Sequence, residues 1–285
     1  MSKKIKTLII GLGKIGLNYD YYLKKKSFLT HSSTVENHKN FDLVCGIDIK
    51  NKNRKLFEKK YQKKTYINLV TALKTEKIDL VIISYECKNI LNILLKILNN
   101  NSPKFILFEK PFLTDINQFL KIKKILLKNK INFRVNFQRS FNKRYTGVVK
   151  KIFKKNENKK IIISYTGDFL SNAIHYLFLI CPFINNIKGI KKNKNLISIN
   201  AKNLEILFIK LSFDYSMNKM EIYSNNDYYL LSGRNEKFYV STKSRDKQYN
   251  QVKILKNNAI IDLESNFNQK IVMDEINKFI NSYQE

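Results

Sequence analysis

The sequence predicts an α/β protein in two parts. A doubly wound parallel sheet is expected over residues 1–138, and an α+β domain with a mostly antiparallel open sheet over residues 139–285. Three observations favour this. An apolar run, Ile5 to Ile10, stops abruptly at a glycine, as a strand buried on both faces does. Strand-like and helix-like segments then alternate to about residue 138, after which strand-like segments follow one another directly.

Length and composition agree with two soluble globular domains. The chain has 285 residues, and one domain usually takes roughly 150. It is 44% hydrophobic with only 8 Gly and 3 Pro, which excludes collagen-like and disordered classes. No apolar run reaches the ~18 residues that a membrane helix needs, so no membrane partner is expected.

The three cysteines, Cys45, Cys87 and Cys181, have neither the spacing of a metal clip nor the even count of a disulfide framework. They are interpreted as buried thiols in a reducing cytoplasm, with no metal site. The lysine-rich start and short apolar stretch of residues 1–16 lack the features of a signal peptide.

The charge balance raises the possibility of nucleic-acid binding. Lys and Arg number 53 against 23 Asp and Glu, a net charge of +30. Only six of the basic residues are Arg, the residue on which base readout depends, and the lysines are spread over the whole chain. We interpret the charge mainly as solvated lysines, with a positive field for anionic small molecules as the alternative. No specific nucleic acid is expected.

The most informative stretch follows the first strand. Gly11-Leu12-Gly13-Lys14-Ile15-Gly16 is a complete GxGxxG, and the residues from Ile15 onward can continue as a helix. In a dinucleotide site the first glycine makes the tight turn, the second lets the backbone approach a diphosphate, and the third lets helix pack on strand. The diphosphate would lie at the helix N-terminus. The alternative is a glycine turn made for packing alone.

A second strand, Asp42 to Ile49, brings Asp48 to its end. A carboxylate there accepts ribose hydroxyls and repels a 2′-phosphate, which favours NAD over NADP, although Lys50 could offset this. Asp48 lies 32 residues after Gly16 rather than about 20. We therefore expect an inserted loop over residues 24–41, in which His31 is either a polar loop residue or a contact to cofactor or substrate.

The alternation continues to the end of the first domain. Helices are expected over residues 53–61, 68–75, 90–98 and 113–127, and strands over 78–84, 104–108 and 131–135. Ligands bind at the carboxyl ends of such strands. The residues expected to cluster there are Gly11, Asp48, Ser84 and Glu109.

In the second domain the pattern predicts helices over residues 141–154, 172–181 and 269–283, the last packing back on either domain. The predicted strands cover residues 160–166, 196–200, 204–213, 219–224, 228–232, 237–241 and 251–254.

With these elements in order, the chain resembles the glucose-fructose oxidoreductase and inositol dehydrogenase family, called Gfo/Idh/MocA, over essentially its whole length. The glycine motif and Asp48 are joined by three further features. These are Glu109-Lys110-Pro111, which matches the EKP signature; Asn136-Phe137-Gln138-Arg139, which resembles the strand-end substrate segment; and His175, on the first helix of the second domain.

The resemblance implies an NAD(P)-dependent oxidoreductase acting on the CH–OH group of a sugar, inositol or sugar nucleotide, for example in surface polysaccharide synthesis, and assembled as a homodimer or tetramer. It implies Lys110 and His175 as the catalytic residues. An imidazole with a pKa near ~6.5 suits removal of a hydroxyl proton, and Lys110 would stabilise the alkoxide. The implied cofactor-binding residues are Gly11, Gly13, Lys14, Ile15, Gly16, Asp48, Ser84, Tyr85, Glu109 and Lys110; the substrate-binding residues are Lys110, Gln138, Arg139, Asn172 and His175.

The chain also departs from the family pattern. Ser84-Tyr85 and Asn89 replace a Thr-Pro pair and a histidine, Phe178 stands where many members have Asp, and Ser171 or Asn172 stands where many have an acid. For Lys110 the alternative is a solvated surface lysine, and for His175 a satisfied core histidine. Three functions are therefore carried forward: a dehydrogenase or ketoreductase, a cofactor-binding sensor or scaffold that has lost catalysis, and a nucleic-acid-binding protein.

Overall fold

The structure of the chain, a computed structural model, forms two compact units that divide between Gln138 and Arg139. It describes residues 4–23, 28–85, 89–110, 112, 116–141, 143–212, 218–225, 227–232, 237–242 and 261–262. The predicted strand at 251–254 and helix at 269–283 lie outside these residues. In the described part of the chain no helix is both long and apolar enough to cross a membrane.

Unit 1 is a six-stranded, wholly parallel sheet with the strand order β3-β2-β1-β4-β5-β6. Its strands are β1 (Ile5–Ile10), β2 (Phe41–Ile47), β3 (Lys64–Tyr66), β4 (Leu80–Ile83), β5 (Phe105–Phe108) and β6 (Asn132–Val135). Its helices are η1 (Asn18–Asp20), α1 (His31–Asn37), α2 (Asn51–Tyr61), α3 (Leu69–Thr75), α4 (Ile90–Asn100) and α5 (Ile116–Lys128). The predicted doubly wound parallel sheet is confirmed.

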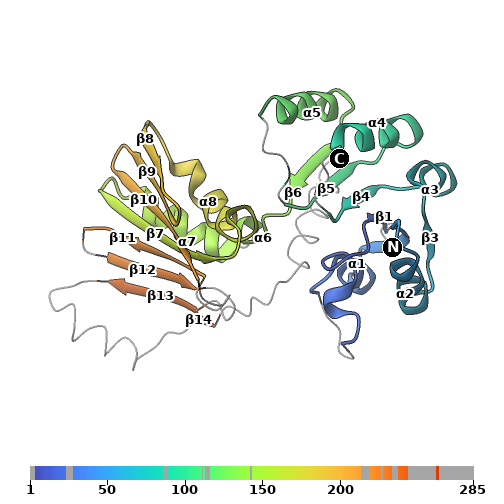
Figure 1. Ribbon diagram of the computed structural model, residues 1–285, viewed down its shortest axis with the longest axis horizontal. Coiled ribbons are helices and arrows are strands. Elements are labelled where there is room, and N and C mark those ends of the chain that lie inside the picture. The colour runs from blue at the N-terminus through green and yellow to red at the C-terminus, as the bar shows by residue number, and fades with distance from the viewer. Residues whose placement is uncertain are drawn as a thin grey trace. The chain divides into compact units, whose positions relative to one another are not determined.

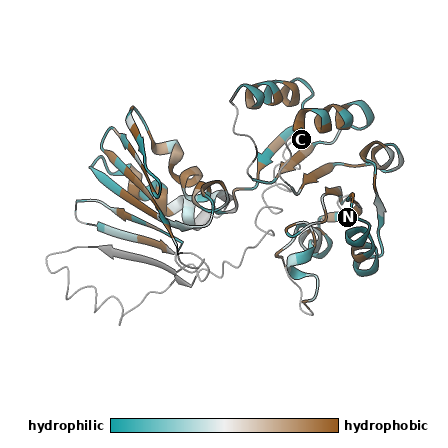
Figure 2. Cartoon of the chain, viewed as in Figure 1, coloured by the Kyte–Doolittle hydropathy of each residue, from teal (hydrophilic) through white to brown (hydrophobic). Residues whose placement is uncertain are grey.

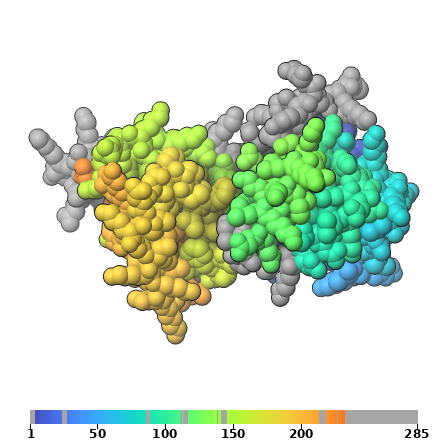
Figure 3. Space-filling view, turned by 90° about the horizontal axis from the view of Figure 1, so that it is seen from above, coloured from blue at the N-terminus to red at the C-terminus, as the bar shows by residue number. Residues whose placement is uncertain are grey.

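The helices cover both faces of this sheet. α1 and α2 lie on one face and α3, α4 and α5 on the other (Figure 1). Figure 3 shows α5, α4 and α3 following one another across the second face. Every residue of β4 and β5 is at most 1% exposed, which explains why both strands are continuous apolar runs. The order reverses between β1 and β4, and in such sheets this switch point is where a ligand binds.

The segment after the glycine motif differs from the prediction. The helix expected from Ile15 onward is only a turn followed by η1, and the expected inserted loop over residues 24–41 contains helix α1. Polar contacts explain the difference. Thr30 caps α1 by accepting from the N–H of Ser33, and the buried Asp20 carboxylate accepts from the Thr30 N–H at 3.1 Å and hydroxyl at 2.8 Å. Because this cluster is polar, it gives no apolar helical period in the sequence.

Unit 2 is an eight-stranded, mostly antiparallel sheet with the order β14-β13-β12-β11-β7-β10-β9-β8. Its strands are β7 (Lys159–Thr166), β8 (Ile187–Lys192), β9 (Leu196–Ala201), β10 (Leu204–Leu211), β11 (Lys219–Tyr223), β12 (Asp227–Ser232), β13 (Lys237–Thr242) and β14 (Ile261–Asp262). The neighbours β7 and β10 are parallel, and the other pairs are antiparallel. Strand β8 was missed because its lysine-rich sequence forms an exposed edge.

Helices cover one face of this second sheet. They are α6 (Gln138–Phe141), α7 (Lys143–Lys154), a π-helix η2 (Phe169–Ala173), α8 (Ile174–Ile180) and the 3-10 turn η3 (Cys181–Phe183). Apolar residues of α7 and α8 form a single core with β7, β10 and β11. Apolar and polar residues alternate along these strands (Figure 2), as a sheet with one covered face requires. The predicted α+β architecture is confirmed.

The cysteine prediction is correct for one thiol and wrong for another. Cys45 is buried in β2, and its burial raises the pKa of the thiol to about 12. Cys181 is exposed at the start of η3. Cys87 lies outside the described residues.

Candidate functional site

The glycine motif forms a tight turn directly after β1. Gly11 has a φ of +92°, a conformation that L side chains rarely adopt. A Cβ on Gly16 would lie 2.1 Å from the Gly11 carbonyl oxygen, whereas a Cβ on Gly13 would meet nothing within 4 Å. Gly11 and Gly16 are therefore required by the turn itself, and Gly13 leaves open space beside it. This open space fits a diphosphate approaching the backbone.

Asp48 lies immediately after β2, beside the glycine turn. Its Oδ2 accepts from the backbone N–H of Leu12 at 2.8 Å, and its Oδ1 from that of Lys50 at 2.7 Å. The side chain of Asn53 donates to Oδ2 at 3.0 Å. The guanidinium of Arg54 donates to the Asp48 carbonyl at 2.8 Å. The carboxylate thus joins the glycine turn to the start of α2, at the position where an adenosine ribose is bound in such folds.

Ser84 supports the turn from the other side of the switch point. It follows β4, and its hydroxyl donates to the Ile10 carbonyl at 3.0 Å and also to the Gly11 carbonyl. Tyr85 is 40% exposed, and its ring lies against Gly11. The hydroxyl of Ser84 therefore donates to the backbone of the turn, and the ring of Tyr85 lies against the same turn at Gly11.

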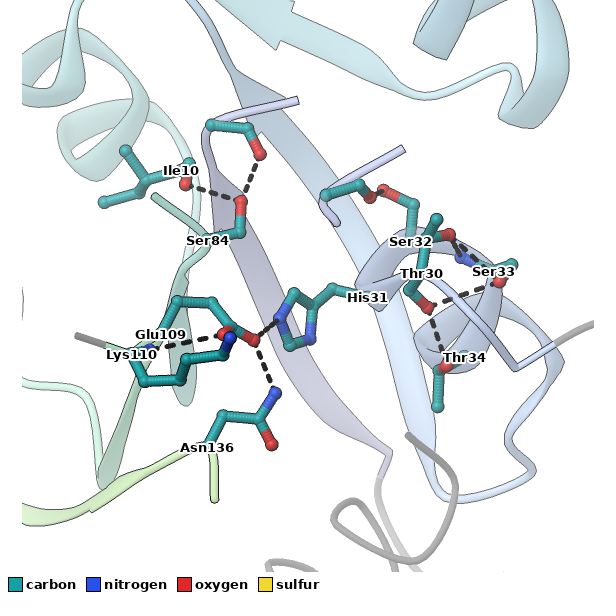
Figure 4. Close-up of polar contacts among 12 residues, drawn as sticks. Ile10, Thr30, His31, Ser32, Ser33, Thr34, Ser84, Glu109, Lys110 and Asn136 are labelled. Carbon is teal, nitrogen blue, oxygen red and sulfur yellow. Dashed lines mark hydrogen bonds and ion pairs between the residues drawn. The ribbon is translucent and has the colours of Figure 1, made fainter. Parts of the chain in front are cut away.

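Glu109 and Lys110 follow β5, and a buried polar cluster surrounds the carboxylate (Figure 4). Glu109 is 8% exposed, and its Oε1 lies 2.7 Å from Nε2 of His31. The side-chain amide of Asn136, which follows β6, donates to the same oxygen, and the N–H of Lys110 donates to Oε2 at 3.3 Å. The ends of β5 and β6 and the start of α1 therefore meet at Glu109. Lys110 itself is half-buried.

The interpretation of His31 as a polar loop residue is wrong, because the histidine is fully buried in α1. Sequence reasoning also missed Asn136 as a partner of Glu109. Thr30, a good N-cap residue followed five positions later by the apolar Val35, is the sequence signal that could have indicated a helix here. Lys14 and Ile15 lie in the turn, where the Ile15 carbonyl accepts from the N–H of His31 at 3.0 Å.

The remaining predicted residues belong to unit 2. His175 is 5% exposed near the start of α8, and Asn172 precedes it in the π-helix. The Asn172 amide donates to the Thr166 carbonyl at 2.6 Å, which ties the π-helix to the end of β7. The guanidinium of Arg139 lies over the ring of Tyr176, 4.5 Å from its centroid. The side chain of Gln138 lies outside the described residues.

One acidic residue shortly before His175 in the sequence was not predicted. Asp168 precedes the π-helix, and its side chain accepts from the N–H of Ser171 at 3.0 Å. It lies seven positions before His175, two helical turns rather than one, and for that reason it was overlooked. π-Helical turns occur frequently at functional sites. Among the described residues, no three His, Cys, Asp or Glu side chains gather as a metal site.

The first unit matches the model of a known protein family. Residues 5–137 match the model of the oxidoreductase family with an NAD-binding Rossmann fold, Gfo/Idh/MocA. No curated protein sequence matches the chain.

Several solved structures share the fold of both units. A myo-inositol 2-dehydrogenase from Lactobacillus plantarum is 15% identical, with a TM-score of 0.65 over 94% of each chain. The WlbA dehydrogenase from Chromobacterium violaceum, solved with NADH and UDP-GlcNAcA, is 13% identical, with a TM-score of 0.66 over 89% of this chain and 81% of that one. A 3-ketoreductase from Actinomadura kijaniata, solved with NADP and TDP-benzene, is 12% identical, with a TM-score of 0.66 over 86% and 82%.

Proposed function

We propose that this chain, whose residues 5–137 match the model of the Gfo/Idh/MocA oxidoreductase family, transfers a hydride between a nicotinamide cofactor and a secondary alcohol or ketone of a sugar, inositol or sugar nucleotide. One observation carries the proposal. The glycine turn, Asp48 and the Glu109-Lys110 pair all follow the carboxyl ends of strands in one parallel sheet, around its switch point. The fold is shared with enzymes solved with UDP-GlcNAcA and with TDP-benzene.

The residues of unit 1 fit a dinucleotide. The space beside Gly13 would take the diphosphate, Asp48 would face the ribose, and Tyr85 would border the pocket. When bound, the nicotinamide accepts or donates the hydride. Residues 1–138 are accordingly proposed as the cofactor domain, and residues 139–285 as the substrate-binding and oligomerisation domain.

The proposed proton chemistry belongs to Lys110 and His175. The ammonium group of Lys110 would hold the reacting oxygen and stabilise negative charge as it develops there. The imidazole of His175 would take the hydroxyl proton in oxidation and return it in reduction. Arg139 and Asn172 would contribute to substrate binding, Asn172 through the segment that it ties to β7.

The experiment that tests this function compares turnover and cofactor binding in the same preparations. We expect Lys110→Met and His175→Ala each to reduce turnover about 10²- to 10⁴-fold and to leave the NADH dissociation constant nearly unchanged. The assay panel contains UDP- and TDP-sugars and myo-inositol. Because both residues would act on one proton and one oxygen, the double variant should be little worse than the poorer single one. Near-normal turnover in both single variants would refute the site.

A second candidate function is cofactor binding without catalysis, as in a sensor or scaffold. It is favoured by Phe178, which is 41% exposed on α8 at the position where many members of the family have Asp. A wild-type protein that binds NADH and turns over none of the panel would support this alternative.

We also propose that the protein is a cytoplasmic homo-oligomer, a dimer or tetramer. In the described part of unit 2, α7 and α8 pack on one face of the sheet, and the opposite face would form the contact between copies. Light scattering in solution tests this, and a monomer at all concentrations would contradict it.

A further inference from the structure

His31 occupies a position that links the glycine turn to the strand end that carries Lys110. It is the first residue of α1, and its N–H donates to the Ile15 carbonyl. The next residue, Ser32, donates to the Gly16 carbonyl from its N–H at 3.1 Å and from its hydroxyl at 2.6 Å. The start of α1 is therefore fixed directly to the backbone of the glycine motif.

From this anchor the His31 side chain crosses to the ends of β5 and β6. Its Nε2 lies 2.7 Å from Oε1 of Glu109, the oxygen that also accepts from Asn136. Because a carboxylate only accepts, the imidazole carries a proton on Nε2 and donates it to this hydrogen bond. Its Nδ1 has no hydrogen-bond partner among the described residues. Among the described residues, the imidazole therefore makes its side-chain hydrogen bond with Glu109.

Glu109 needs these donors because a buried carboxylate without partners is strongly unfavourable. Its other oxygen accepts from the backbone N–H of Lys110, and Figure 4 shows the Lys110 side chain turned toward the same carboxylate. Any shift of Glu109 would consequently move the chain from which Lys110 extends and change the charge beside it.

We propose that His31 is a positioning residue for Lys110. His31 fixes the Glu109 carboxylate from the side of the glycine turn and so sets the position of Lys110. This role rests on the proposed function, in which Lys110 holds the reacting oxygen. His31 contacts the Ile15 carbonyl and its neighbour Ser32 contacts the Gly16 carbonyl, so the start of α1 joins the placement of Lys110 to the loop proposed to bind the cofactor.

The test uses three variants of the full chain. His31→Leu removes the donor, and His31→Gln supplies an amide N–H in its place. Thr34→Ala is the matched control, because Thr34 is equally buried in α1 but donates only locally, to the Thr30 carbonyl at 2.6 Å. Two readouts are taken: steady-state turnover, and NMR of ¹³C-methylated lysines with the Lys110 signal identified by its loss in Lys110→Met.

We expect His31→Leu to shift the Lys110 resonance and to lower kcat about 10²-fold, because small misplacements of catalytic groups have effects of this size. NADH affinity should change far less. His31→Gln should restore most of the rate, and Thr34→Ala should resemble the wild type. In a Lys110→Met background, His31→Leu should cause no further loss of kcat.

An unchanged Lys110 resonance in a folded His31→Leu protein would overturn the proposal. So would an equal effect of Thr34→Ala, which would indicate simple destabilisation of α1. If His31→Leu does not fold, the resonance in His31→Gln decides, since it should then match the wild type. A wild type without turnover but with a shifted Lys110 signal in His31→Leu would contradict the proposed function and leave the positioning role supported.

Discussion

At the scale of single residues, Asp48 sets the expected cofactor preference. Its carboxylate is held beside the glycine turn by the N–H groups of Leu12 and Lys50. In the proposed cofactor site, this carboxylate would face a 2′-phosphate. We expect NAD(H) to bind ten- to a hundred-fold more tightly than NADP(H), since a hydrogen bond to a charged group contributes ~1.5–3 kcal/mol.

Calorimetry on the wild type and on Asp48→Asn measures this preference. The asparagine keeps an oxygen for the Leu12 N–H but removes the charge, so the preference should shrink toward one. Equal or tighter NADP binding by the wild type would contradict the assignment. The nearby cations Lys50 and Arg54 would then be the first groups to examine.

At the scale of elements, two substitutions in the glycine turn should distinguish an effect on folding from an effect on cofactor binding. In Gly16→Ala the new Cβ would meet the Gly11 carbonyl, a backbone atom that cannot move aside, and overpacking of this kind costs ~1–3 kcal/mol. In Gly13→Ala the new Cβ meets no atom within 4 Å, so the variant should fold normally, but its methyl group would occupy the space proposed for the diphosphate.

Thermal unfolding and NADH titration distinguish the two variants. Gly16→Ala should lower Tm and weaken NADH binding, whereas Gly13→Ala should weaken NADH binding alone. Unaltered NADH affinity in Gly13→Ala would show that the open space is not the diphosphate site.

In the second sheet, the start of β12 is joined to the segment after α7 by an ion pair. Asp227 accepts a hydrogen bond from the Lys155 ammonium, which lowers the pKa of the Asp227 carboxyl, and the hydroxyl of Tyr229 donates to it at 3.1 Å. A depressed pKa in the folded state stabilises the protein above the unfolded value of about 3.9, and this contribution is lost as the pH falls through the folded value.

Asp227→Asn should therefore lower Tm at pH 7, and its difference from the wild type should diminish as the pH approaches 3. Glu205→Gln is the control, because its pair with Lys160, at 3.0 Å, is exposed on both sides and should contribute little. A Tm difference for Asp227→Asn that is the same at both pH values would contradict the electrostatic explanation.

At the scale of the whole molecule, the net charge of +30 predicts weak, nonspecific attraction to polyanions. Complexes with duplex DNA should form at about 50 mM salt and largely dissolve by about 200 mM, because each phosphate contact releases counterions. Fluorescence anisotropy with two unrelated duplexes measures this. A complex that keeps a sequence preference at physiological salt would favour the nucleic-acid function instead.

The sequence by itself determined the two architectures and most of their strands. Strands β1, β4 and β5 were predictable because a strand buried on both faces must be apolar, and the glycine motif marks where β1 ends. In the second domain the alternation of apolar and polar residues indicated a sheet with one covered face. These features are local, since each depends on the period of a short segment.

Only the tertiary structure decided the polar interior of the site. His31 and Glu109 are 78 positions apart, and no local pattern tells which distant carboxylate a buried imidazole will meet. The same holds for Ser84, whose hydroxyl donates to the Gly11 carbonyl 73 positions away, and for Asn136, whose amide donates to Glu109. Helix α1 was hidden for the same reason: its buried face is polar and is satisfied by partners outside the helix, such as Asp20 and Glu109, rather than by apolar packing that would leave a 3.6-residue period.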